Sequence, residues 1–212
     1  SDGFEGILQG QDPSSYQVEE LHLAAMHFAS FVLESPTFFT CDEWAALSVN
    51  TQEVCAWESI ERFAKRAYRR PLRLAELDRL RAFWQVNLTG GQLDEAIALT
   101  AAGILQVPSV HFRLESSDPS VPVSQWELAT RLSYFLWDSM PDEELFAAAA
   151  SGQLSLVEDV EYQVRRMLDD PRARSAIVHF HHQWLGTDEV LLVAPARRAF
   201  GPLFGISPRL KD

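Results

Sequence analysis

Residues 124–145 read SQWELATRLSYFLWDSMPDEEL, and this stretch decides the expected fold. Five of its apolar side chains recur at helical spacing and define one face of an α-helix: Leu128, Ala129, Leu132, Phe135 and Leu136. That face is flanked by Trp126, Tyr134 and Trp137, which widen the apolar surface nearly all round. We therefore expect a helix buried on more than one side, at the centre of a helical core, that ends near Asp138.

The rest of the chain repeats this pattern of amphipathic helices separated by proline and glycine. The further expected helices span residues 16–33, 51–69, 74–86, 93–105, 156–168 and 171–185. Apolar and polar residues alternate over 110–114, which is strand periodicity over too few residues to form a sheet. The predicted fold class is all-α, a multi-helix bundle-like array with at most one short extended segment near 110–114.

A polar, proline-bearing connection, SSDPSVPV at residues 116–123, is the best candidate boundary between two lobes. It divides the chain into an N-terminal helical lobe, 1–117, and a C-terminal helical lobe, 118–212. The N-terminal lobe contains the Arg-rich helix pair at 51–86.

Composition excludes several function classes. The chain has 212 residues, is 47% hydrophobic and carries a formal net charge of −12. An acidic chain does not favour nucleic acid or an anionic membrane surface as partner, because both need cations on the protein. No apolar run reaches the ~18 residues of a transmembrane segment. Because the chain begins with Ser1 and shows no signal-peptide pattern, we expect a processed or excised piece.

The only two cysteines are Cys41 and Cys55. No CxxC, CxxCH or cysteine–histidine zinc spacing is present, so no c-type haem is attached to this chain. A disulfide that closes a loop of about 15 residues and a pair of buried thiols both fit the spacing. The residues alone leave these two alternatives open.

Eight of the eighteen cations fall within twenty residues. They are Arg62, Lys65, Arg66, Arg69, Arg70, Arg73, Arg79 and Arg81. The favoured interpretation is a solvated face balanced by acidic neighbours elsewhere in the fold. The functional alternative is an anion site or a docking patch for an acidic partner. The candidate anion patch consists of Arg62, Lys65, Arg66, Arg69 and Arg70.

A second cluster consists of His179, His181 and His182 on the last helix. His179 and His182 are three residues apart and are weak candidates for a shared metal, but no acidic residue on this helix completes a site. The expected core face is Ala173, Ile177, Phe180 and Trp184. We interpret the histidines as a partly exposed cluster. Motifs such as G-x-S-x-G, H-E-x-x-H and the Walker loop are absent, so no catalytic residue is assigned.

Several ordered segments together resemble a known family. They are FAKRAYRRPL (63–72), ILQVPSVHFRLE (104–115), ELATRLSYFLWDSMPDEEL (127–145), GQL (152–154), VRRMLDDPRA (164–173) and FHHQWL (180–185). The chain resembles the large exported proteins of unknown function that are abundant in planctomycetes and myxobacteria. Those proteins are built from tandem uncharacterised domains, and many also carry a c-type cytochrome domain.

The resemblance implies export to the periplasm or cell envelope, which favours a Cys41–Cys55 disulfide. It implies no cofactor on this chain, with haem c on a linked domain or a partner, and it carries over no catalytic residue. Because the family's domain continues beyond FGISPRLKD, the C-terminal lobe is expected to be truncated.

Three functions follow as hypotheses. The leading one is an accessory module that binds the rest of the parent protein or a c-type cytochrome, beside electron transfer. The second is a part of an oxidoreductase whose haem or metal lies on another domain or chain. The third is an anion- or glycan-binding domain that uses the arginine cluster.

Overall fold

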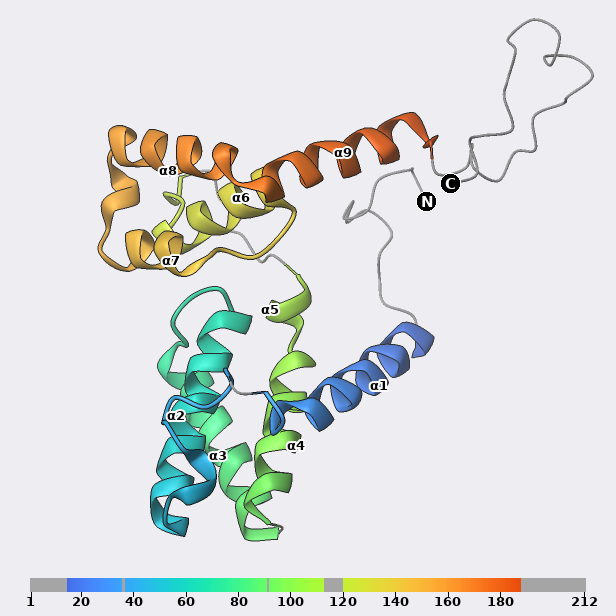
Figure 1. The fold of residues 1–212 in the computed structure, drawn as a ribbon, viewed down its shortest axis with the longest axis vertical. Coiled ribbons are helices and arrows are strands. Elements are labelled where there is room, and N and C mark those ends of the chain that lie inside the picture. Colours follow the sequence, from blue (N-terminus) through green and yellow to red (C-terminus); the bar gives the residue numbers. More distant parts are fainter. Residues whose placement is uncertain (1–14, 36, 91, 113–119, 188–212) are drawn as a thin grey trace, which may run out of the picture.

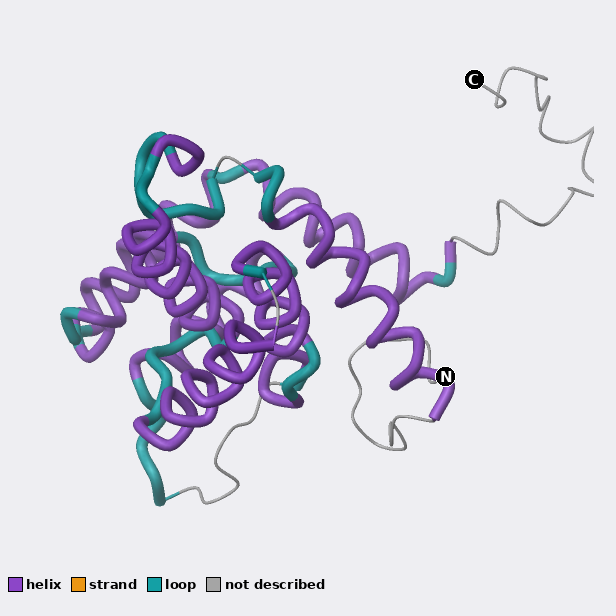
Figure 2. The backbone as a smooth tube through the Cα atoms, turned by 90° about the horizontal axis from the view of Figure 1, so that it is seen from below, coloured by secondary structure: helices purple, strands orange, loops and turns teal. Residues whose placement is uncertain are grey.

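The computed structural model describes residues 15–35, 37–90, 92–112 and 120–187. Over these ranges the chain is all-α, as predicted, and contains no strand (Figures 1 and 2). The helices are α1 (Ser15–Val32), α2 (Val49–Ala67), α3 (Leu74–Gly90), α4 (Leu93–Leu105), α5 (Pro108–His111), α6 (Gln125–Trp137), α7 (Glu143–Ala150), α8 (Val157–Asp169) and α9 (Pro171–Leu185), with short 3-10 helices η1 (Trp44–Ala46) and η2 (Gln153–Ser155). None of the described helices is long and apolar enough to cross a membrane.

The predicted extended segment near 110–114 is wrong for its first two residues. Val110 and His111 lie in α5, where Pro108 occupies the first turn with its φ angle already suited to a helix. Phe112 has an extended backbone, and its N–H closes the short helix by donating to the Pro108 carbonyl at 2.8 Å. Residues 113 and 114 lie outside the described ranges.

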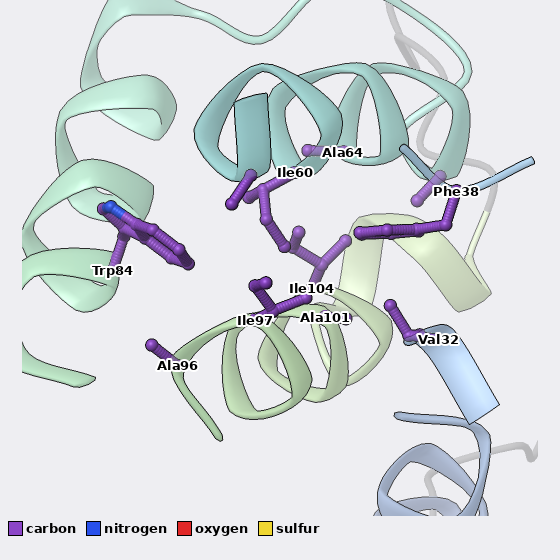
Figure 3. Close-up of a cluster of buried hydrophobic side chains, with 11 residues drawn as sticks. Val32, Phe38, Ile60, Ala64, Trp84, Ala96, Ile97, Ala101 and Ile104 are labelled. Atoms are coloured by element: carbon purple, nitrogen blue, oxygen red, sulfur yellow. The ribbon is translucent and has the colours of Figure 1, made fainter. Parts of the chain in front are cut away.

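The first core is built around α4, which packs against α1, α2 and α3. Figure 3 shows Ile60 of α2, Trp84 of α3 and Ile97 of α4 pointing into it, and all three are almost fully buried. The small residues Ala96 and Ala101 on α4 are also fully buried. Small side chains let neighbouring backbones approach closely, so α4 can be covered on several sides.

A disulfide between Cys41 and Cys55 fastens the loop after α1 to α2, with the two Cα atoms 6.1 Å apart. Further bonds hold the same loop, since the Thr40 N–H donates to Ser59 Oγ at 2.9 Å. The disulfide reading is therefore confirmed over the reading with two free thiols.

The second core is built by α6, α7, α8 and α9. A capping box between Ser124 and Glu127 starts α6, and Trp137 at its end donates from Nε1 to the Met167 carbonyl at 2.8 Å. The prediction for Phe135 is wrong, because its side chain is 84% exposed. The other predicted residues hold, since Ala129 is buried and Leu128, Leu132 and Leu136 pack, partly buried, against this core. The buried residues of α6 also include Thr130, Ser133 and Trp137. The short side chains let α6 lie close to its neighbours, and the helix is turned so that Trp137 fills the core.

The predicted core face of α9 is also largely wrong. Ala173 is buried, but Ile177, Phe180 and Trp184 are 54%, 52% and 60% exposed. The helix itself has the expected bounds, from the Asp170 cap to Gly186 at φ 60°. Figure 1 gives the reason, since α9 projects beyond the helices that pack against its first turns.

The helix contacts fall into two groups, α1–α4 and α6–α9, with α5 between them (Figure 1). The predicted division after residue 117 lies within 113–119, outside the described ranges. That division stays a prediction.

Candidate functional site: the cationic face of α2 and an aromatic groove

Helix α2 has one buried face and one cationic face. Ser48 caps its N-terminus by accepting the Thr51 N–H. Its buried face carries Cys55, Ala56, Ser59, Ile60, Ala64 and Ala67. Lys65 and Arg66 lie in its last turn, where cations interact favourably with the negative end of the helix dipole.

Three cations at this end of α2 contact the second group of helices. The contacts join Lys65 to Trp126 (5.8 Å from Nζ to the ring centroid), Arg69 to Tyr134 (5.9 Å from Cζ) and, as an ion pair, Arg66 to Glu143. The partners come from α6 and the first turn of α7. Part of the cluster therefore forms contacts within the chain. Of these three partners only Glu143 is an acidic neighbour of the kind that the interpretation of a solvated, balanced face expects.

Arg69 is a buried cation, only 8% exposed. Its guanidinium donates to the carbonyls of Ser109 and Val110 at 2.7 and 2.9 Å, and more weakly to that of Phe112 at 3.4 Å. These carbonyls lie at the C-terminal end of α5, where partial negative charge collects. Arg69 thus ties the end of α2 to α5.

Arg70 and Glu76 form a two-bonded ion pair across the turn between α2 and α3, with both N–O distances 2.8 Å. Hydrogen bonds from Arg70 lower the pKa of Glu76 to about 2, although partial burial opposes the shift. The Arg73 N–H also donates to Glu76 at 2.7 Å and lowers its pKa further. This pair organises a turn.

Arg62 and Arg66 reach a groove of about 640 Å³ beside α2. Its apolar lining includes Phe28, Phe31, Val32, Phe38 and Phe63, and its polar lining includes Ser35, Thr37, Arg62, Arg66 and Glu143. Phe63 is central, with its ring centroid 5.9 Å from those of both Phe28 and Phe38. The candidate anion patch is thus divided: two members line the groove and the other three have partners elsewhere. Whether it binds an anion stays a prediction.

The histidines are arranged differently from a shared metal site. His179 Nδ1 lies 2.7 Å from Asp138 Oδ2, and Gln183 Nε2 lies 2.8 Å from His179 Nε2. A neutral ring that donates to Asp138 and accepts from Gln183 satisfies both bonds. Among the described residues, no three His, Cys, Asp or Glu side chains are grouped to hold a metal. Metal binding by His179 and His182 stays a weak prediction.

Sequence reasoning missed Asp138 as the partner of His179. Asp138 ends α6 in the left-handed conformation, φ 51°, and is 41 residues from His179 along the chain. No local pattern links an aspartate after one helix to a histidine on another. Only the packing of α6 against α9 brings them together.

The chain matches two family models. Residues 123–210 match PSD4, described as a protein of unknown function (DUF1592). Residues 55–115 match PSD5, described as a protein of unknown function (DUF1595). The first match includes α6–α9, and the second runs from α2 to α5. The predicted resemblance is thereby confirmed at the level of two domains of unknown function. No curated protein and no solved structure matches the chain.

Proposed function

We propose that this chain is a non-catalytic interaction module of an exported protein, and that the exposed face of α9 binds another domain of the parent polypeptide. The observation that carries this proposal is the exposure of Ile177, Phe180 and Trp184, each more than half exposed on one helix. Contiguous exposed apolar side chains on a folded protein mark interaction surfaces.

The chemistry of α9 suits a docking surface. Phe180 and Trp184 stack with their ring centroids 6.1 Å apart, which gives a large and rigid apolar contact. Aromatic side chains of this kind dominate the binding energy of protein interfaces. The sequence of α9 contains arginine and histidine but no Asp or Glu. A partner surface with acidic groups around an apolar centre would complement it.

The disulfide supports export, because disulfides form and persist in oxidising compartments such as the periplasm. The family resemblance supports a c-type cytochrome on the parent polypeptide or on a partner, with the module working beside electron transfer. The haem then belongs to that domain or partner.

The test uses isothermal titration calorimetry between this chain and the separately purified remainder of the parent polypeptide. We expect Phe180→Glu with Trp184→Glu to weaken binding at least tenfold, because both anchors are lost. The matched control is Phe135→Glu, which places the same charge on an exposed aromatic of α6 and leaves the affinity unchanged. Unaltered binding by the double variant, with its helicity intact by circular dichroism, would rule out α9 as the docking face.

A second candidate function is part of an oxidoreductase, and the contact between His179 and Asp138 supports it. A carboxylate on one ring nitrogen orients the ring, as around many metal-bound histidines. A metal at Nε2 of His179 would have to displace the Gln183 amide that donates to it. Absorbance spectra and elemental analysis of the purified chain separate the two candidates. The interaction module predicts no stoichiometric iron, copper or zinc. Stoichiometric metal that His179→Ala removes would overturn the non-catalytic module.

A further inference from the structure

The groove beside α2 has the dimensions and lining of a small-molecule site. Its volume of about 640 Å³ falls within the range of pockets that hold small organic ligands. Such pockets are mostly apolar and carry a few fixed polar groups. Here phenylalanines from α1, the following loop and α2 supply the apolar part, and two of them, Phe28 and Phe31, are 47% and 52% exposed.

The charge at the groove comes from Arg62. Nη2 of Arg62 donates to the carbonyls of Thr37 and Phe38 at 2.7 and 2.6 Å, which fixes the guanidinium in place. Within the described part of the chain, Arg62 has no carboxylate partner, and its Nε and Nη1 have no hydrogen-bond acceptor. Arg62 is an exposed side chain, so an incoming ligand can reach this positioned cation.

We propose that this groove binds a small amphipathic carboxylate, with its apolar body among the phenylalanines and its carboxylate on Arg62. A fixed guanidinium with two donors still available matches the two oxygens of a carboxylate. The apolar body contributes burial against rings that are already stacked around Phe63. This site is independent of the docking face on α9.

Glu143 occupies the second cation of the groove, Arg66, as its ion-pair partner. Its carboxylate, on the first turn of α7, is paired with Arg66, so a ligand carboxylate competes with Glu143 there but not at Arg62. Removing the charge of Glu143 makes Arg66 available as a second anchor. Loss of the Arg62 charge should therefore lower the affinity of the groove for a carboxylate, and loss of the Glu143 charge should raise it.

The test compares phenylbutanoate with its uncharged analogue phenylbutanamide, each titrated into the purified chain by calorimetry. We expect the carboxylate to bind at least tenfold tighter, since a charge-assisted hydrogen-bonded pair is lost in the amide. Arg62→Gln should lower the affinity for phenylbutanoate to that for phenylbutanamide, and Glu143→Gln should raise the affinity for phenylbutanoate. The matched control is Arg79→Gln, which removes an exposed cation on α3 and should change the affinity for neither probe.

Equal affinities of the two probes for the unmodified chain would overturn the proposal, and this measurement does not depend on any variant folding. Phe31→Ala supplies a second check, because its ring lines the groove and is 52% exposed. This substitution should lower the affinities for both probes by the same factor, so that the ratio of the two affinities is unchanged. If Phe31→Ala left both affinities unchanged, the probes would bind outside this groove, and the proposal would be wrong.

Discussion

Arg69 is the residue on which the end of α2 and the short α5 both depend. It is buried, its backbone φ of 58° is in the left-handed region, and its guanidinium satisfies carbonyls that α5 leaves open. We expect Arg69→Ala to lower the free energy of unfolding by about 1–3 kcal/mol, because those partly buried carbonyls lose their charged donor. Chemical denaturation measures this.

The control for that prediction is Arg79→Ala on the exposed surface of α3. It should change stability by no more than about 0.5 kcal/mol. Equal small effects of both substitutions would mean that water replaces Arg69 at no cost.

Glu76 makes stability depend on pH in the acid range. Its pKa is about 2 in the folded chain, below the ordinary value of 4.5, because Arg70 hydrogen-bonds its charged form. A lowered folded pKa contributes stability that is fully present above pH 4.5 and is lost as the pH falls toward 2. We therefore expect unfolding free energy to decline over that window in the unmodified chain. In Glu76→Gln the decline should be smaller, and an identical pH profile would contradict the assignment.

At the scale of elements, the disulfide holds the loop that carries Phe38 and the Arg62-bound carbonyls against α2. Closing a loop of about 15 residues stabilises the folded chain by roughly 3 kcal/mol. We expect Cys41→Ala with Cys55→Ala to lower the denaturation midpoint by a corresponding amount. A reducing agent should shift the midpoint of the unmodified chain but not that of the double variant, and a shift in both would contradict this.

Helices α4 and α9 show how far local sequence reaches. Both have the predicted bounds, residues 93–105 and 171–185. Caps, prolines and apolar spacing act within a few residues, so they are readable from sequence. The faces were harder to predict, because Phe135 of α6 and Ile177 of α9 have the right spacing for a core yet are exposed. Spacing defines a stripe, but another element must be present to bury it.

At the scale of the whole molecule, the two groups of helices meet through cations and aromatic rings. The Arg66–Glu143 pair is largely exposed, with side chains 39% and 80% accessible. An exposed ion pair contributes little, typically 0.2–1 kcal/mol. We expect Arg66→Glu to destabilise the chain by no more than about 1 kcal/mol, and the exchange Arg66→Glu with Glu143→Arg to restore part of it. Differential scanning calorimetry of the four members of this cycle measures the coupling energy, and zero coupling would show that the pair makes no net contribution to stability.

Some features of the candidate site could be predicted from the sequence and others could not. The concentration of cations at 62–70 and the cysteine pair were visible in the sequence, because both are matters of composition and spacing. The groove was not, since its lining comes from α1, the loop, α2 and α7. Nor was the pairing of Asp138 with His179.

The sequence by itself determined that this chain is helical, where its best-capped helices begin and end, and that it resembles two domains of unknown function. Those properties depend on residues close together in the chain. Only the tertiary structure decided that Arg62 faces an aromatic groove, that Lys65 and Arg69 contact the rings of α6, and that the apolar face of α9 is left open. The physical reason is that a side chain's chemistry depends on its neighbours in space, and here those neighbours lie tens of residues away along the chain.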